Sequence, residues 1–280
     1  MRPSFRLHHC TAIITGASSG LGAEFARQLA PHADGLVLTA RRADALERVK
    51  DEVQSLNPDL KVILCACDIA SDAGRAQLLE VTTALEPFPN LLINNAGAGD
   101  YGTFATSDEA RTRGQIDLNI TALVMLTHAL LPRLQRGAGT PAGVLNVSSL
   151  AAMLPMPGLA VYAATKSFVT SFSEALRVEL SDANVVVTAV CPGPTPTNFG
   201  RNARRPDGTD TDRSGQGLIR VRPQTVVRQA LDALSQGRAC VHPGVSVTLA
   251  SVLFRLMPRR MMRLLIEKRF RAGSRERAPI

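Results

Sequence analysis

The sequence has no tryptophan and two tyrosines, Tyr101 and Tyr162, and aromatic residues make up 4% of its 280 positions. Proteins that bind single-stranded nucleic acid stack the bases on aromatic side chains, so this scarcity argues against that class. Long apolar runs are missing as well. The longest uncharged run in the C-terminal segment, residues 243–254, has 12 residues, whereas a helix that crosses a bilayer needs about 20. We therefore expect no transmembrane helix.

Cysteine is sparse, and its pattern fits neither disulfides nor zinc. The five cysteines are an odd number, and their spacings match no zinc-binding pattern. The first ten residues contain two arginines and two histidines, so they lack the apolar core of a secretory signal. The sequence therefore predicts a reducing, cytoplasmic location and no metal centre.

Excess positive charge is confined to the C-terminal end. The net formal charge is +8, and residues 255–280 hold nine Lys or Arg and two Glu, which gives +7, so residues 1–254 have a net charge of +1. A nucleic-acid-binding domain concentrates positive charge on its folded body. We therefore expect no nucleic-acid partner.

Apolar runs with strand character alternate with stretches of helical periodicity along most of the chain. This alternation is typical of a parallel sheet with helices on both faces. We predict one α/β domain over residues 1–245, with a Rossmann-like, doubly wound sheet of about seven strands. Residues 193–222 are rich in Pro, Gly and Arg and indicate a lid, and residues 246–280 form a C-terminal extension. The predicted strands are 11–15, 36–40, 61–66, 91–94, 144–148, 185–190 and 239–242; the predicted helices are 23–30, 43–56, 74–85, 108–135, 162–180 and 223–235.

A glycine-rich segment joins the first predicted strand to the first helix. Gly16, Gly20 and Gly22 allow a sharp turn and a close approach of the backbone to a pyrophosphate. Ser18 and Ser19 add hydroxyl donors, and the helix N-terminus adds unpaired N–H groups. A purely steric turn is the alternative. The position between a strand and a helix favours a dinucleotide-binding loop.

The end of the second strand indicates which dinucleotide binds. Sites specific for NAD place an acidic residue there to hold the ribose hydroxyl, but this strand ends in Arg41 and Arg42, and the next acid is Asp44. Two guanidinium groups suit a 2′-phosphate, although a solvated turn would look the same. The sequence favours NADP(H) over NAD(H).

A candidate catalytic group follows the fifth strand. Tyr162 and Lys166 are four residues apart, which puts phenol and ammonium on one face of a helix, where the cation would lower the pKa of the tyrosine. Ser149 follows the strand and has a hydroxyl for a substrate carbonyl. Asn119 is a polar residue inside a predicted helix, which is mildly unfavourable unless its amide is used.

Together these segments resemble the short-chain dehydrogenase/reductase family, in order and spacing, over residues 11–245. The resemblance implies that Tyr162 is the general acid or base, that Ser149 polarises the carbonyl, that Lys166 also binds the nicotinamide ribose, and that Asn119 holds a relay water. It implies hydride transfer between nicotinamide and a carbonyl or alcohol carbon, without a metal. The further cofactor-binding residues that it implies are Leu21, Asp68, Ile69, Asn95, Ala96, Gly97, Pro192, Gly193, Thr195 and Thr197.

We therefore expect an NADP(H)-dependent carbonyl reductase or alcohol dehydrogenase that forms a homodimer or homotetramer. The substrate is expected to be apolar, such as a 3-oxoacyl or steroid-like ketone, because apolar residues follow Ser149 and the Pro192-Gly193 turn. These residues are Leu150, Met153, Leu154, Met156 and Phe199. A dinucleotide-binding regulator without turnover is the alternative, because a fold does not guarantee chemistry.

The basic tail has the pattern of an amphipathic helix. Met261, Met262, Leu265 and Ile266 form an apolar stripe between residues 259 and 270. Three partners fit such a helix: the body of the protein or another subunit, a membrane surface reached through residues 255–280, or an acidic carrier protein.

Overall fold

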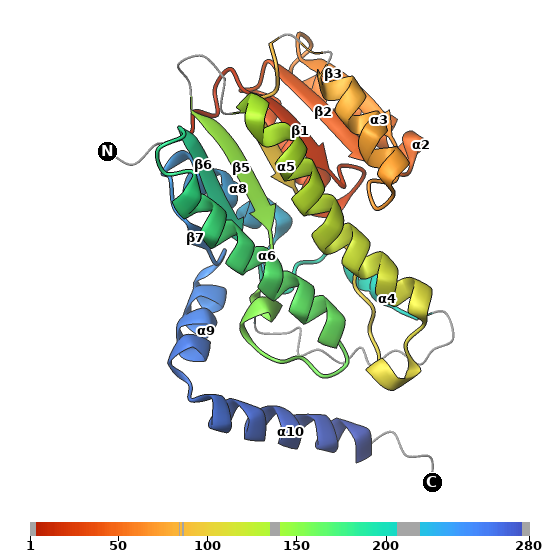
Figure 1. Ribbon diagram of the computed structural model, residues 1–280, viewed down its shortest axis with the longest axis vertical. Helices are drawn as coiled ribbons and strands as arrows, with labels where there is room; N and C mark the ends of the chain where they lie inside the picture. Colours follow the sequence, from red (N-terminus) through yellow and green to blue (C-terminus); the bar gives the residue numbers. More distant parts are fainter. Residues whose placement is uncertain (1–3, 84, 86, 135–140, 206–218, 276–280) are drawn as a thin grey trace.

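The computed structural model describes residues 4–83, 85, 87–134, 141–205 and 219–275. Seven parallel strands form one sheet in the order β3-β2-β1-β4-β5-β6-β7 (Figure 1). This is the doubly wound, Rossmann-like architecture that the sequence predicts. The strands are β1 (Thr11–Thr15), β2 (Gly35–Ala40), β3 (Lys61–Ala66), β4 (Leu91–Asn94), β5 (Ala142–Val147), β6 (Val185–Val190) and β7 (Cys240–Val241).

Helices connect the strands and continue beyond the last one. The α-helices are α1 (Gly20–Leu29), α2 (Ala43–Leu56), α3 (Asp72–Thr83), α4 (Glu109–Ile116), α5 (Leu123–Leu134), α6 (Ala160–Glu179), α7 (Asn198–Ala203), α8 (Pro223–Ser235), α9 (Val245–Leu256) and α10 (Arg259–Arg275). Two short 3-10 helices, η1 (Phe104–Thr106) and η3 (Leu150–Met153), and one π-helical turn, η2 (Asp117–Ala122), complete the described elements.

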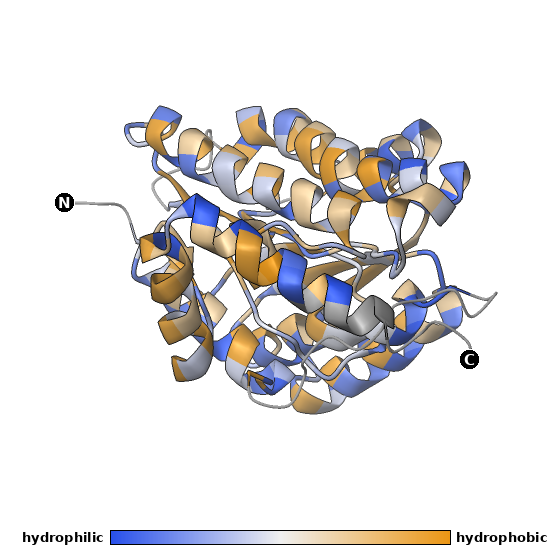
Figure 2. Ribbon diagram, turned by 90° about the horizontal axis from the view of Figure 1, so that it is seen from below, coloured by the Kyte–Doolittle hydropathy of each residue, from blue (hydrophilic) through white to orange (hydrophobic). Residues whose placement is uncertain are grey.

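Alternate residues of each strand face opposite helical layers. In β1, Ala12 and Ile14 pack into a core with α1, α2 and α8, whereas Ile13 packs into a second core with α3, α5 and α6. Figure 2 shows the sheet between these two layers. Because helices cover both faces, the strands are almost continuously apolar, which is the pattern that made them recognisable in the sequence.

Helices α4, η2 and α5 form one continuous helix, Glu109–Leu134, close to the predicted span. By length and composition alone this helix could cross a membrane, because an 18-residue stretch of it has a mean hydropathy of 1.2. The expectation of no transmembrane helix overlooks this match. Leu126 and Leu130 of this helix are buried against the sheet in the second core. The apolar composition is therefore that of a core helix in an α/β sandwich.

The C-terminal segment leaves the sheet after β7. Helices α9 and α10 extend away from the body (Figure 1), and the predicted helix at residues 259–270 lies within α10. Val247 anchors α9 in the first core, and Met262 of α10 is buried. Of the predicted lid, residues 193–205 and 219–222 are described, and they include the short helix α7; residues 206–218 lie outside the described part of the chain.

Candidate functional site

The predicted site residues follow strands whose carboxyl ends meet at one edge of the sheet. Strands β1 and β4 are neighbours, although β2 and β3 separate them in the sequence. The order of the strands reverses between β1 and β4, and open α/β sheets bind ligands at such a switch point. The topology thus gathers the glycine loop, Asn95, Ser149 and Pro192 at this edge.

The glycine loop between β1 and α1 has the backbone of a tight turn that can face an anion. Gly16 has a φ of +67° and Gly20 a φ of +59°, a left-handed conformation that favours glycine. A Cβ atom on Gly22 would lie 2.2 Å from the carbonyl oxygen of Gly16, so there is no room for a side chain. Ser19 precedes α1 and makes no side-chain cap hydrogen bond, which leaves the helix N-terminus open to a phosphate. The other predicted loop residues, Ser18 and Leu21, are half-buried.

Asn95 braces the glycine loop from behind, a role that the sequence analysis misses. Its Nδ2 donates to the carbonyl oxygens of Thr15 at 2.9 Å and Gly16 at 3.3 Å. The Thr15 hydroxyl accepts from the backbone N–H groups of Asn95 and Ala96, both at 3.0 Å. The signal for this brace is Thr15 itself, because a buried polar residue at the end of an apolar strand needs partners. Ala96 and Gly97, two of the predicted ribose contacts, have no long side chain that could obstruct the glycine loop.

The adenosine end of the predicted site lies at the ends of β2 and β3. Arg41 and Arg42 are exposed directly after β2, and Nη2 of Arg42 lies 3.5 Å from Oγ of Ser18. After β3, Asp68 is exposed and Ile69 is buried. The end of the second strand therefore places the Arg42 guanidinium beside the glycine loop, and Arg41 is exposed next to it in the chain.

The structure brings Ser149, Tyr162 and Lys166 together where β5 ends and α6 begins. Ser149 lies close enough to Tyr162 for its side chain to lower the tyrosine pKa, and Nζ of Lys166 lies 5.8 Å from the centre of the tyrosine ring. Lys166 is buried, and its Nζ donates to the carbonyl oxygen of Val147 at 2.8 Å. The phenol and the ammonium thus share one face of α6, the arrangement that their spacing predicts.

Burial controls the protonation of both groups. It raises the pKa of Tyr162 to about 12, although the nearby Ser149 side chain opposes the shift. It lowers the pKa of Lys166 to about 8, because a buried ammonium loses its hydration. The shift at Tyr162 is opposite in direction to the lowering that the sequence analysis expects from Lys166. At neutral pH the phenol keeps its proton, which is the form that a proton donor requires.

Asn119 is buried in the π-helical turn η2. Its Oδ1 accepts from the backbone N–H of Ala98 at 2.8 Å, and its Nδ2 donates to the Ala98 carbonyl at 2.9 Å and to Thr165 Oγ1 at 3.0 Å. Turns of π-helix are frequent at functional sites. Through these hydrogen bonds the side chain connects the loop after β4 to α6, at the residue that precedes Lys166. The amide is a positioning group, and a relay water at Asn119 stays a prediction.

The loop after β6 returns to the glycine loop. Pro192 is buried, and Oγ1 of Thr195 donates to the carbonyl oxygen of Gly193 at 3.0 Å. Thr197 caps α7, and a Cβ atom on Gly20 would lie 3.2 Å from the Cβ atom of Thr197. The predicted nicotinamide-side residues therefore lie against the phosphate-side loop.

An apolar cluster surrounds the tyrosine of the candidate catalytic group. The ring centroid of Phe199, on α7, lies 5.3 Å from that of Tyr162. The other members are Tyr101, Met156, Leu159 and Ala203. Met156 and Phe199, which the sequence predicts to line a substrate site, thus lie beside Tyr162, whereas Leu150 and Met153 pack into the first core.

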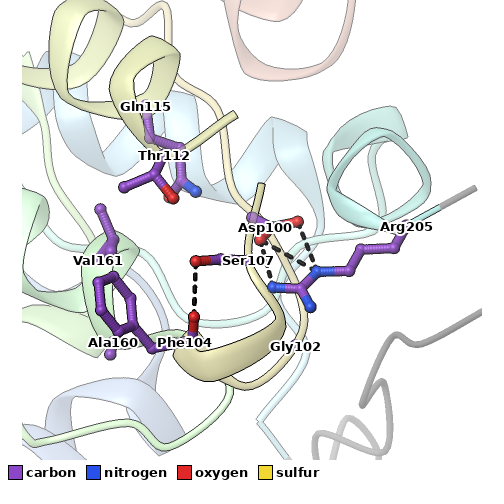
Figure 3. A pocket seen from close by; sticks show the side chains of 9 residues that line it. All are labelled: Asp100, Gly102, Phe104, Ser107, Thr112, Gln115, Ala160, Val161 and Arg205. Carbon is purple, nitrogen blue, oxygen red and sulfur yellow. Dashed lines mark hydrogen bonds and ion pairs between the residues drawn. The ribbon is translucent and has the colours of Figure 1, made fainter. Parts of the chain in front are cut away.

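A buried ion pair, which the sequence analysis misses, fixes the two segments that hold this cluster. Nη2 of Arg205 lies 2.6 Å from Oδ2 of Asp100, and Nε of Arg111 donates to Oδ1 at 3.0 Å. Beside the pair, the backbone N–H of Tyr101 donates to the carbonyl of Ala203 at 2.9 Å. Figure 3 shows the pair at the side of a small pocket formed by η1, α4 and the start of α6. The first part of the predicted lid is therefore anchored to the loop after β4.

Known proteins share this sequence pattern and this fold. The family model described as short chain dehydrogenase matches residues 10–208. Sulfoacetaldehyde reductase from Chromohalobacter salexigens is 40% identical over 191 residues, which are 66% of this chain and 72% of that protein. A short-chain dehydrogenase from Sphingobium yanoikuyae in complex with NADPH has a TM-score of 0.75 and 27% identity, covering 89% of this chain and 97% of that one. The 3-ketoacyl-(acyl-carrier-protein) reductase from Brucella melitensis, complexed with NADH, has a TM-score of 0.73 and 26% identity, covering 86% and 98%.

Proposed function

The chain belongs to the short-chain dehydrogenase family, and on this premise we propose that it reduces aldehydes or ketones with NADPH. Membership makes it an oxidoreductase of alcohol and carbonyl groups that uses a nicotinamide dinucleotide. One observation carries the role of Tyr162 as proton donor. Tyr162 lies inside an apolar cluster, where burial raises its pKa to about 12, so the phenol is protonated at neutral pH.

The side chains divide the chemistry among them. The nicotinamide, when bound, supplies a hydride to the carbonyl carbon. Ser149 donates a hydrogen bond to the carbonyl oxygen, and Tyr162 transfers its proton to that oxygen as negative charge develops there. The ammonium of Lys166 stabilises the remaining phenolate. Asn119 holds the turn of α6 that positions Lys166.

Tyr162→Phe tests the proton donor. We expect normal NADPH binding and loss of nearly all turnover, because only the hydroxyl is removed. Tyr101→Phe is the matched control: it removes a hydroxyl from the same apolar cluster and should keep turnover within about tenfold. The assay is NADPH oxidation at 340 nm with apolar ketones, aldehydes, 3-oxoacyl thioesters and sulfoacetaldehyde. Turnover by Tyr162→Phe close to that of the wild type would refute the assignment.

The apolar cluster around Tyr162 supports a substrate with an apolar body, such as a 3-oxoacyl or steroid-like ketone. The same panel tests this class, because an apolar ketone should have a lower KM than sulfoacetaldehyde if the apolar side chains of the cluster contact the substrate. Preference for sulfoacetaldehyde would contradict the apolar assignment. NADPH binding without turnover on any substrate would favour the non-catalytic regulator.

Preference for NADP(H) rests on Arg41 and Arg42, which are both exposed after β2, with the Arg42 guanidinium beside the glycine loop. Hydrogen bonds to charged groups contribute about 1.5–3 kcal/mol, so the double change Arg41→Ala, Arg42→Ala should weaken NADPH about 10- to 100-fold and leave NADH nearly unchanged. Arg48→Ala is the control, because Arg48 is exposed further along α2 and pairs with Asp44. An unchanged ratio of the two Kd values would show that the preference is set elsewhere.

A homodimer or homotetramer is supported by exposed apolar side chains on the α4–α5 helix and on α6. Ile116, Met125 and Phe168 are each more than 40% exposed, and burying such residues favours association. Phe168→Glu should therefore lower the mass measured by light scattering after gel filtration. Val178→Glu is the control, because Val178 is exposed near the C-terminal end of α6. An unchanged mass for Phe168→Glu would exclude this face.

The C-terminal extension, residues 246–280, has the surface of a helix that lies on an anionic membrane. One face of α9 exposes apolar side chains at intervals of three or four residues, and α10 adds more beside arginines. Among the described side chains of α9 and α10, the exposed apolar residues are Val245, Leu249, Val252, Leu253, Leu256, Met261, Leu264 and Leu265. The charge of +7 in residues 255–280 favours anionic lipid over a second copy of the same surface, which it would repel.

Cosedimentation with liposomes tests the membrane contact. The full chain should bind vesicles that contain phosphatidylserine at low salt and not neutral phosphatidylcholine vesicles. Leu249→Glu with Leu256→Glu should abolish binding, whereas Val178→Glu should not. Failure of the full chain to bind anionic vesicles would disprove the contact, and NADPH binding by every variant would show that the fold is intact.

A further inference from the structure

Three side chains with metal-ligating atoms meet where β6 and β7 end. Cys191 directly follows β6, Cys240 begins β7 and His242 directly follows β7. Their ligand atoms all lie within 4.8 Å of one another. Ala189 is the register partner of Cys240, and the N–H of Cys191 donates to the Val241 carbonyl at 2.8 Å. Since residues two apart on a strand share a face, parallel pairing brings the three donors to one side of the sheet.

The distance between the two sulfur atoms suits a shared cation. Sγ of Cys191 and Sγ of Cys240 are 3.7 Å apart. Two thiolates that bind one zinc ion at about 2.3 Å, with a tetrahedral angle between the bonds, are separated by about 3.8 Å. A disulfide would bring the sulfurs to about 2.05 Å. The β6–β7 pairing therefore holds the cysteines at the separation of two metal ligands without any shift of the backbone.

The donor types select the kind of cation. Two cysteine sulfurs and one imidazole nitrogen suit zinc and other thiophilic ions, whereas magnesium and calcium prefer oxygen. Cys191 is 1% exposed, while Cys240 and His242 are half-buried, so a cation can reach the cluster along the edge strand β7. We propose that Cys191, Cys240 and His242 bind one thiophilic divalent cation of the zinc class, with a fourth position open to solvent.

A cation at this site would link the catalytic domain to the C-terminal extension. On one side, Cys191 precedes Pro192, and its sulfur lies 3.7 Å from Oγ1 of Thr170, which donates to the Lys166 carbonyl at 3.1 Å. On the other side, Thr248 of α9 donates to the His242 carbonyl at 2.8 Å. Cross-linking β6 to β7 would therefore fix the start of the loop after β6 and the start of α9. Zinc should therefore raise the melting temperature of the protein.

Cobalt(II) is the probe, because thiolate ligation gives it a strong near-ultraviolet charge-transfer band. The full chain, reduced and stripped with a chelator, should bind one equivalent of Co²⁺ with this band, and Zn²⁺ should displace it. Cys240→Ser and His242→Ala should each weaken binding at least tenfold and abolish the rise in melting temperature with zinc. The control is Cys65→Ala with Cys67→Ala, which removes another close pair of sulfurs, 3.6 Å apart, and should leave binding unchanged.

Three results would overturn the proposal. They are the absence of a thiolate band with excess Co²⁺, a band that survives both Cys240→Ser and His242→Ala, and a band lost in the Cys65, Cys67 variant. Metal-free melting temperatures establish that each variant folds. If His242→Ala does not fold, His242→Gln replaces it, because the amide fills much of the imidazole volume and is a far weaker zinc ligand. All readouts are independent of reductase activity.

Discussion

The ion pair between Asp100 and Arg205 leads to a quantitative prediction. Asp100→Asn removes the negative charge and keeps the size of the side chain. Both side chains are almost fully buried, 5% and 4% exposed. Nη2 of Arg205 donates to Oδ2 of Asp100 at 2.6 Å. Its Nε donates to both carboxylate oxygens at 3.1 Å. The change therefore leaves a buried guanidinium without its counter-charge.

The expected loss of stability follows from this burial. Removing one partner of a buried ion pair lowers the free energy of unfolding by about 3–5 kcal/mol. Arg205 keeps hydrogen bonds to Thr106 Oγ1 at 2.8 Å and to the Thr103 carbonyl at 3.2 Å, and the new amide can still accept one. We therefore expect about 3 kcal/mol, at the lower end of the range. KM for apolar substrates should also rise, because the pair fixes Tyr101 and α7.

Urea unfolding at several pH values is the assay. Burial alone would raise the pKa of Asp100, but hydrogen bonds and charge from Arg205, with a contribution from Arg111, outweigh it and hold that pKa below its ordinary value. The carboxylate therefore stabilises the fold above its unfolded pKa of about 3.9, and this stabilisation is lost as the pH falls through the lower pKa of the folded state. The difference between wild type and variant should be constant from pH 5 to 7 and shrink below about pH 3.9.

Asp44→Asn is the matched control, since its partner Arg48 is 2.9 Å away and both side chains are about two-thirds exposed. It should lower the free energy of unfolding by no more than about 1 kcal/mol. A loss of less than 1 kcal/mol for Asp100→Asn, or a loss equal to that of the control, would refute the reasoning.

Two further predictions concern the glycine loop and the buried lysine. Gly22→Ala should weaken NADPH binding at least tenfold, because its Cβ would lie 2.2 Å from the Gly16 carbonyl oxygen; Gly114→Ala, with open space around it, should leave the Kd unchanged, and equal values for the two would contradict the argument. Lys166 has a pKa of about 8 in the folded protein against about 10.4 unfolded, so the unfolded chain binds more protons between these values and stability should rise with pH across them. Urea midpoints at pH 7.5 and 9.5 should show this rise in the wild type relative to Lys166→Met; parallel changes in both proteins would count against it.

The sheet could be predicted from the sequence because its strands are buried on both faces. The predicted bounds of β1, β3, β4 and β6 agree with the structure, while β5 begins two residues earlier and β7 is shorter than predicted. The order of the glycine loop, Ser149, Tyr162 and Lys166 along the chain identified the family, because the first two directly follow strands and the last two share one face of the next long helix. Patterns of this kind involve residues that are close together in the sequence, so they can be recognised without a structure.

Interactions between distant segments could not be predicted in the same way. Asp100 and Arg205 are 105 residues apart, and the composition around Arg205 is that of a solvated lid. Cys191 and Cys240 are 49 residues apart, so linear spacing alone predicts no metal centre. The pKa of Tyr162 depends on the apolar side chains around it, and these come from three separate segments.

The pairing of β1 with β4 has a consequence for biosynthesis. Ala12 of β1 is the register partner of Leu91 of β4. One edge of β1 therefore has no neighbouring strand until the ribosome has synthesised β4, 79 residues later. At about 5–20 residues per second, this interval is about 4–16 s. During that time the nascent chain presents an apolar strand with unsatisfied backbone groups, the kind of edge that aggregates. The brace between Thr15 and Asn95 forms only when the interval ends, so ribosome stalling before that point leaves a chain that dinucleotide cannot rescue.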